Sequence, residues 1–339
     1  MLINSKRNMH LPKKQKDQGK SKCSAAFTGQ CILCPVSLLL SSILKSYYCQ
    51  DPGGTESYII FGMSYDNKDS MFLQEDHFPK RIICLTEETT ETLYLLGEQE
   101  RIVGISGFTV RPAVARKEKP IVSTFTGASI DKILALAPDL VIGFSDLQSN
   151  IAKELIAKGV TVWVNNHRSV DGIFGMIVQL GSLVGKGEQA NEMVKGFKNE
   201  IEKIKNANED MRKKPKVYFE EWFDPLISGI CWVSELIELA GGIDIYEEKR
   251  NASLAKDRII ADNNEVVERN PDIIIASWCG KMFKKEKLLA RKNWHAINAV
   301  KSDMIFEIKS SIILQPGPAA VGEGISMIAK IIRQWHERQ

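Results

Sequence analysis

The chain has little of what metal sites and disulfide frameworks require. Its five histidines include no pair at i,i+4 spacing, so we read them as surface or loop residues and expect no resident metal. Of the seven cysteines, four precede residue 50 and three lie far apart. That distribution is neither a disulfide framework nor a zinc knuckle. Cys84 and Cys231 lie among apolar residues, which predicts plain core positions.

Signatures of catalysis are also scarce. No G-x-G-x-x-G opens a predicted helix, and residues 181–187 lack one residue and the final Ser or Thr of a P-loop. No G-x-S-x-G elbow is present. Glu220 and Glu221 are adjacent on a predicted strand, so they point to opposite faces and cannot act on one substrate. We expect a protein that is not an enzyme and uses no cofactor.

The charge and the N-terminal segment leave fewer conclusions. A net charge of +3 over 339 residues gives no argument for nucleic acid, and we expect a monomer. The apolar run Cys31–Leu44 is too short to span a membrane but suits a signal-peptide core. No small-x-small cleavage site follows it. The protein is periplasmic or extracytoplasmic if that run acts as a signal core, and cytoplasmic if translation starts near Met71.

The most distinctive feature of the chain is a sequence motif that occurs twice. Residues 134–144 read LALAPDLVIGF and residues 267–277 read VERNPDIIIAS. In each copy a helix-periodic run ends at Pro-Asp, because proline cannot donate to the helix ladder. The unbroken apolar run that follows suits a parallel strand covered on both faces. The repeated motif therefore predicts two similar α/β lobes with a cleft between them.

Short strands and amphipathic helices alternate on both sides of a long helix expected at 187–207. The expected strands are 81–85, 101–106, 120–124, 140–144, 161–165, 216–222, 272–278 and 304–309. This order predicts two Rossmann-like lobes with parallel sheets, joined by a rigid helix that leaves the cleft largely preformed. The expected parts are an N-terminal extension (1–77), a first lobe (78–168), a helical connection (169–212) and a second lobe (213–339).

Aromatic residues gather at the ends of the expected strands. They are Phe108, Phe125, Trp222, Trp232 and Trp278. Ligands of open parallel sheets bind beyond the carboxyl ends of the strands. Aromatic rings there offer broad apolar contact. Core packing is the alternative reading for Trp222 and Trp278, and the five positions together favour a shared ligand face.

From Pro79 onward the chain resembles the cobalamin- and siderophore-binding group of substrate-binding proteins of ABC importers, and within it the cobalamin-binding members. The segments that carry the likeness are 81–97, 123–144, 218–242, 253–260, 277–281 and 307–319. The resemblance implies a non-catalytic binder of a cobalamin-like corrinoid, with an ABC permease dimer as partner. The residues it places in the ligand-binding loops are Thr86, Glu87, Phe108, Phe125, Trp222, Trp278, Ser311 and Gln315.

The resemblance also implies acidic residues for docking to the permease. They would fall at Asp131 in the first lobe and near Asn264 in the second, where Glu265 is a neighbour. Arg258 stands where an aromatic often lies in the family. A soluble intracellular corrinoid binder is therefore an open variant. Two further alternatives remain open: a ferric-siderophore or haem binder on the same fold, and a two-lobed enzyme such as a glycosyltransferase.

Overall fold

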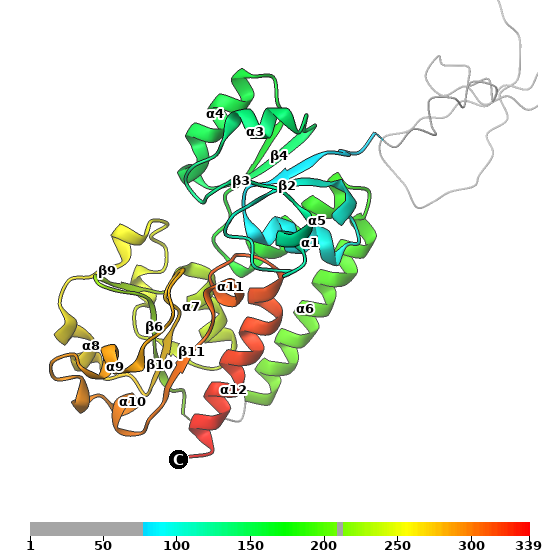
Figure 1. Ribbon diagram of the computed structural model, residues 1–339. Coiled ribbons are helices and arrows are strands. Elements are labelled where there is room, and N and C mark those ends of the chain that lie inside the picture. Colours follow the sequence, from blue (N-terminus) through cyan, green and yellow to red (C-terminus); the bar gives the residue numbers. More distant parts are fainter. Residues whose placement is uncertain (1–76, 209–212) are drawn as a thin grey trace, which may run out of the picture. The chain divides into compact units, whose positions relative to one another are not determined.

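The computed structural model describes residues 77–208 and 213–339. The signal-core reading, the cysteines before residue 50 and the alternative start near Met71 concern residues outside that part. Two sheets and the helices around them make up the described chain (Figure 1). We call the residues around the first sheet the first lobe and those around the second sheet the second lobe. No helix among the described residues combines the length and the apolar character needed to cross a membrane.

The first sheet has five parallel strands in the order β3-β2-β1-β4-β5. The strands are β1 (Ile82–Cys84), β2 (Ile102–Ser106), β3 (Ile121–Ser123), β4 (Leu140–Phe144) and β5 (Val162–Asn165). Four helices alternate with them: α1 (Glu87–Leu95), α2 (Ala115–Glu118), α3 (Ile130–Ala135) and α4 (Ser149–Ala157). Strands β1 and β4 are buried along their whole length, as covered parallel strands should be. Cys84 is fully buried, which confirms it as a core residue, whereas Cys231 is only half-buried and its predicted core position is wrong.

The Pro-Asp motif has the same structural role in both lobes. The residue before the proline takes the left-handed conformation in each copy, with φ of 42° and 45°, and the preceding helix ends there. The aspartate then binds the start of the neighbouring strand. Asp139 accepts a hydrogen bond from the backbone N–H of Lys80 at 2.7 Å, and Asp272 accepts one from Lys216 at 3.0 Å. The repeated motif thus joins a helix end to two adjacent strands.

The second sheet is mixed, with the order β11-β10-β6-β7-β9 and β8 also paired to β6. Its parallel strands are β6 (Lys216–Phe223), β8 (Ile243–Asp244), β10 (Ile273–Ala276) and β11 (Ile305–Glu307). Strand β7 (Leu226–Ser228) runs antiparallel to both of its neighbours, β6 and β9 (Ile259–Ile260). The expectation of an entirely parallel second sheet is corrected here. Asp224-Pro225 turns the chain back onto β6, and so short a connection can join only antiparallel strands.

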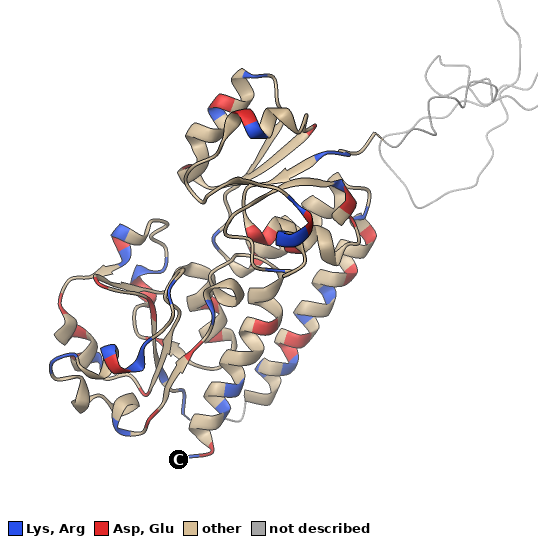
Figure 2. Ribbon diagram, in the orientation of Figure 1, with Lys and Arg blue, Asp and Glu red and all other residues tan. Residues whose placement is uncertain are grey.

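Two long helices connect the sheets. Helix α5 (Val170–Leu183) begins at Ser169, whose hydroxyl accepts a hydrogen bond from Gly172 N–H at 3.0 Å, as expected for a capping serine. Helix α6 (Gly187–Asn208) has 22 residues and is therefore about 33 Å long. Its buried face is Ala190, Val194, Ile201 and Ile204. Lysines and glutamates occupy its outer positions (Figure 2).

The remaining helices surround the second sheet and close the chain. They are α7 (Cys231–Leu239), α8 (Asn263–Arg269), α9 (Lys285–Leu289), α10 (Asn298–Lys301), α11 (Ser310–Ile313) and α12 (Ile325–His336). A π-helical turn, η7 (Ala320–Gly324), leads into α12, and both contact α6. Short 3₁₀ turns lie at Gln99–Arg101, Asp146–Gln148, Glu247–Lys249, Ala255–Arg258 and Trp294–Ala296.

Candidate functional site

A cavity of about 700 Å³ lies between the two lobes. In the first lobe its wall consists of residues that end or follow β1, β2, β3 and β4. In the second lobe it includes Glu221 on β6, Cys279 after β10 and the loop that follows α11. The carboxyl ends of parallel strands are where open α/β sheets bind ligands. The volume falls within the roughly 300–1,000 Å³ typical of small-molecule sites.

Three phenyl rings form an apolar part of the first-lobe wall. Phe108 and Phe125 are 53% and 36% exposed, so their faces are available to a ligand. Phe144, at the end of β4, is only 7% exposed. The edge of His167 packs against it, and the guanidinium carbon of Arg168 lies 4.7 Å from its ring centroid. Two rings are therefore free for contact, and the third is part of the supporting wall.

A buried glutamine holds this wall together. Gln148 accepts a hydrogen bond from the backbone N–H of Phe144 at 2.8 Å. Its amide group donates to the carbonyl oxygen of Phe125 at 2.8 Å and to that of Leu85 at 3.3 Å. One side chain thus ties together residues that follow β1 and β3 and the last residue of β4. Since it is 1% exposed, it acts by positioning the rings and does not face a ligand.

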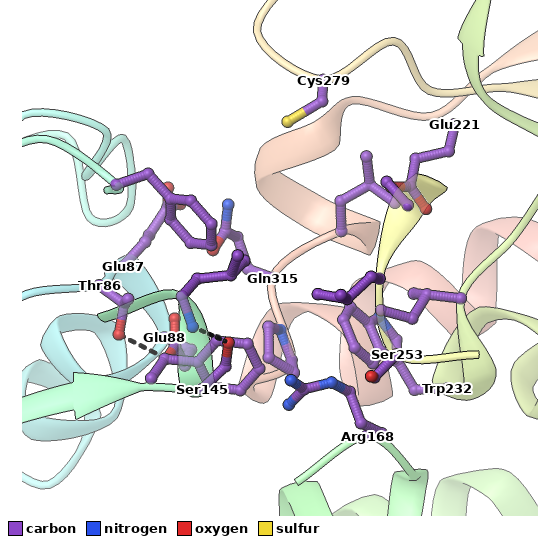
Figure 3. Close-up of a pocket in the computed structure, with 18 of the residues that line it drawn as sticks. Thr86, Glu87, Glu88, Ser145, Arg168, Glu221, Trp232, Ser253, Cys279 and Gln315 are labelled. Atoms are coloured by element: carbon purple, nitrogen blue, oxygen red, sulfur yellow. Dashed lines mark hydrogen bonds between the residues drawn. The ribbon is translucent and has the colours of Figure 1, made fainter. Parts of the chain in front are cut away.

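Beside the rings, the wall carries acidic side chains from the start of α1. Thr86, Glu87 and Glu88 all line the cavity and are at most 3% exposed (Figure 3). Burial raises the pKa of Glu87 to about 8 and that of Glu88 to about 7. The hydroxyl of Thr86 donates to Glu88 at 2.5 Å, and the backbone N–H of Arg111 donates to Glu87 at 3.1 Å. This part of the wall can offer carboxylic acid protons near neutral pH.

The opposite wall carries basic groups, only some of which are free. Arg258 is 1% exposed, and its guanidinium donates to both carboxylate oxygens of Glu221, at 2.6 and 3.1 Å. Lys256 is exposed in the same segment. Arg168 donates to the carbonyl oxygen of His167 at 2.9 Å and lies between the two walls (Figure 3). Arg258 is therefore neutralised in place, whereas Lys256 and Arg168 can meet an anionic group.

A loop near the C-terminus crosses to the first lobe and closes the cavity on one side. Its residues Leu314, Gln315 and Pro316 line the cavity. The carbonyl oxygen of Pro316 lies 2.9 Å from Nε2 of His167. The backbone of Gly317 passes so close to α1 that a Cβ there would lie 2.5 Å from the Cβ of Glu88.

Comparison with known proteins identifies the kind of molecule to which this cavity belongs. The family model described as "Periplasmic binding protein" matches residues 82–312, about two thirds of the chain. This chain belongs to the periplasmic binding protein family. Its described part has the same two-sheet architecture as solved members of that class.

Individual relatives are distant but are matched over most of their length. An ABC transporter substrate-binding lipoprotein of Bacillus subtilis, itself uncharacterised, is 26% identical over 281 residues, which cover 80% of this chain and 86% of that protein. The vitamin B12-binding protein of Yersinia pestis is 26% identical over 202 residues, covering 58% of this chain and 69% of the relative.

Solved structures agree on the fold. A possible iron-binding, periplasmic solute-binding protein of Staphylococcus epidermidis superposes with a TM-score of 0.64 at 25% identity, covering 75% of this chain and 98% of that one. The vitamin B12-binding protein of Vibrio cholerae gives 0.63 at 19% identity, covering 76% and 98%. A periplasmic haem-binding protein gives 0.64 at 18%, covering 76% and 98%. At such identities, the last two show only that the fold is shared.

In this periplasmic binding protein, five of the residues expected in the ligand-binding loops line the cavity: Thr86, Glu87, Phe108, Phe125 and Gln315. Three others do not. Trp278 is 3% exposed and donates its indole N–H to Glu220 at 2.8 Å, so it packs inside the second lobe. Trp222 donates to the carbonyl oxygen of Asp224 at 2.8 Å. Ser311 lines a separate surface depression beside Arg111.

The two acidic residues expected at a docking surface differ in their freedom. Asp131 is exposed in the first turn of α3. Glu265, in the first turn of α8, forms an ion pair of 2.7 Å with Arg269, which also contacts Glu248 at 2.6 Å. Only Asp131 therefore offers a carboxylate without an ion-pair partner among the described residues.

Several wall residues of the binding protein were not identified from the sequence. They include Glu88, Ser145, Arg168, Glu221 and the segment 253–256. Ser145 could have been suspected from the sequence because it directly follows the expected strand 140–144. In the structure its backbone takes φ 64°. Arg168 and Lys256 carry no such signal, because a charged residue in a loop is usually solvated.

Proposed function

We propose that this protein captures a cobalamin-like corrinoid in the cavity between its lobes, as the substrate-binding component of an ABC importer. The observation that carries the proposal is the first-lobe wall, where the accessible rings of Phe108 and Phe125 adjoin the buried polar groups of Thr86 and Glu87. A corrinoid is a broad apolar ring edged with amide arms, so it needs flat apolar contact and scattered polar partners. The vitamin B12-binding relative supports the same choice.

The metal-ligating chemistry of the wall favours a corrinoid over haem. Proteins hold haem iron through His, Tyr, Met or a Cys thiolate. Among the described residues that line the cavity, Cys279 is the one side chain of these types. Desolvation of the Cys279 thiol, although this residue is exposed by surface area, followed by the nearby Glu221 carboxylate, raises its pKa. The neutral thiol is a weak ligand. A corrinoid such as cyanocobalamin brings its own axial ligands and needs none from the protein.

Calorimetry and visible spectroscopy with the purified chain test this proposal. We expect heat release and a spectral change with cyanocobalamin or cobinamide at micromolar concentrations. No response to either corrinoid would refute it. Nucleotide binding in a thermal-shift panel would instead favour a two-lobed enzyme.

The free basic groups support a ferric siderophore as a second candidate. Arg168 and Lys256 line the cavity, and neither pairs closely with a carboxylate of the described residues: the contact of Arg168 with Asp146 is 3.8 Å long. An anionic ferric chelate would be attracted by both. Retention of ferric chelates, together with no retention of corrinoids, would select this candidate.

For the importer role we propose that Asp131 and Glu265 contact the permease dimer. Their positions in the first turns of α3 and α8 place one acidic residue on each lobe. The charge reversal Asp131→Lys should abolish ligand-dependent uptake in vesicles that contain the cognate permease and ATPase. Glu337→Lys, near the C-terminus, serves as a charge-matched control. Equal uptake by both variants would exclude Asp131 from docking.

The cellular location of the protein distinguishes an importer component from an intracellular corrinoid binder. An importer component must lie outside the cytoplasmic membrane, and Cys31–Leu44 is the candidate signal core for that export. A chain that starts near Met71 would be an intracellular corrinoid binder. N-terminal sequencing of the protein isolated from its own cells, with cell fractionation, separates the two.

A further inference from the structure

Two neighbouring carboxyl groups at the start of α1 lie in the cavity wall without a cation. Glu87 and Glu88 are 2% and 1% exposed, and neither forms an ion pair with a described residue. Glu91, one turn later, differs from both. It pairs with Arg111 at 2.9 Å and accepts a hydrogen bond from the backbone N–H of Ala319 at 3.3 Å. The nearest cation therefore serves Glu91.

The hydrogen bonds of the pair are incomplete on the cavity side. One oxygen of Glu87 accepts from the backbone N–H of Arg111 at 3.1 Å, and the nearby backbone N–H of Val110 also lowers the pKa of this group, but the second oxygen is buried and makes no hydrogen bond of normal geometry with a described residue. Glu88 accepts from the hydroxyl of Thr86. A buried polar oxygen without a partner is costly, so it is normally satisfied by water or a ligand. Because Glu87 lines the cavity, its missing partner can come from the cavity contents.

The charge of the pair depends on its surroundings on every side. Burial raises the pKa of both groups, to about 8 for Glu87 and about 7 for Glu88. The other titratable or charged side chains nearby or across the cavity are Cys84, Glu91, Arg111, His167, Arg168, Glu221, Lys256, Arg258 and Cys279. Of these, Arg111 and Arg258 are occupied by Glu91 and Glu221. At about pH 7.5, between these two pKa values, Glu87 therefore keeps most of its proton while Glu88 is largely charged.

We propose that Glu87 and Glu88 form a subsite that accepts uncharged carboxamide arms of the ligand and rejects carboxylate arms. This inference rests on the proposed corrinoid function and specifies which corrinoids fit. A carboxamide both donates and accepts a hydrogen bond, so it can pair with a carboxylic acid that does the same. A carboxylate arm can only accept, and it would add a negative charge beside two buried acids that no cation compensates.

The test compares two corrinoids by calorimetry on the full chain. Dicyanocobinamide carries carboxamide arms, and cobyrinic acid carries carboxylic acids in their place. We expect the unmodified protein to prefer the amide form by at least about tenfold, equivalent to roughly 1.4 kcal/mol. At about pH 7.5 the double variant Glu87→Gln with Glu88→Gln should lower that preference about tenfold, because it removes the negative charge that Glu88 carries at this pH. The control Glu154→Gln, exposed on α4, should keep the original preference.

The pH dependence of the unmodified protein gives an independent readout that needs no variant to fold. Affinity for the amide corrinoid should fall as the pH rises from about 6 to about 9, because the acids lose the protons that they donate. Equal affinity for both corrinoids, or a preference that survives the double substitution, would overturn the subsite while leaving the corrinoid function intact. Failure of both corrinoids to bind would overturn the function and the subsite together.

Discussion

Arg258 holds the Glu221 carboxylate through two hydrogen bonds, of 2.6 and 3.1 Å, at the wall of the cavity. The side chains are only 2% and 16% exposed. Both charges are therefore largely removed from water, and each depends on the other.

Replacing Arg258 should be strongly destabilising. Arg258→Met leaves Glu221 charged and uncompensated, which should lower the free energy of unfolding by about 3–5 kcal/mol in urea denaturation. The matched control is Arg250→Met, which removes the surface pair with Glu238, whose side chains are 32% and 39% exposed. That change should cost at most about 1 kcal/mol. Similar losses from the two variants would contradict this account of the buried pair.

A methyl group at the crossing of the two lobes should disturb both stability and binding. In Gly317→Ala the new Cβ would lie 2.5 Å from the Cβ of Glu88, so the loop or α1 must shift. We expect a loss of about 1–3 kcal/mol in unfolding free energy. Ligand affinity should fall with it, because the shift moves the acidic wall.

The same substitution elsewhere provides its control. Gly196 lies inside α6, and a Cβ there meets no atom within 4 Å. Gly196→Ala should raise stability by about 0.5–1 kcal/mol, since alanine loses less backbone entropy than glycine in a helix. A stabilising effect of Gly317→Ala would refute the close approach.

Phe125, which lines the cavity, should contribute more to ligand binding than Trp222, which does not line it. Phe125→Ala should weaken corrinoid binding by about 1–3 kcal/mol in calorimetry, because the ring faces the cavity. Trp222→Ala should have little effect, because its indole N–H is bound to Asp224 and Lys281 lies 5.0 Å from its ring. An equal loss from both variants would mean that Trp222 also contacts the ligand, as the family resemblance implies.

The acidic pair should also leave a signature in the stability of the protein without ligand. A carboxyl group whose pKa is higher in the folded state binds more protons there than in the unfolded chain. Its stabilising contribution is thus fully present below about pH 4 and is lost as the pH rises through the folded values. Those values are about 7 for Glu88 and about 8 for Glu87.

Thermal unfolding from acidic to mildly alkaline pH measures this effect. The melting temperature of the unmodified protein should fall with rising pH relative to that of the Glu87→Gln, Glu88→Gln double variant. Other titrating groups are common to both proteins and cancel in the difference. Parallel curves would show that neither carboxyl group keeps its proton in the folded state.

The sequence was a good guide to the repeated scaffold. Strands β4 and β10 were predicted from the unbroken apolar runs after Pro138 and Pro271, and α6 from its apolar spacing. Strands β7 and β9 were not predicted, because each directly follows a turn and lacks the alternation with helices by which the other strands were recognised. Their pairing depends on a turn and not on a pattern.

Side-chain direction explains why the site was predicted only in part. Phe144 and Ser277 occupy the same position in the two copies of the Pro-Asp motif. Trp278 therefore lies one residue beyond the position that corresponds to Phe144. Successive residues of an extended chain point to opposite sides, and the Trp278 indole accordingly points to buried Glu220. Phe125 and Gln315 were identified through family resemblance. Arg168 was missed because no local period accompanies it.

The loop that follows α11 has a consequence for biosynthesis. Leu314, Gln315 and Pro316 line the cavity, and Ala319 binds Glu91 from 228 positions away. A chain emerging from the ribosome therefore carries both sheets before it carries the residues that bring the lobes together. Contacts between such distant positions pay a large loop-closure entropy and form late. A nascent chain therefore cannot trap its ligand before residues 314–319 have left the ribosome.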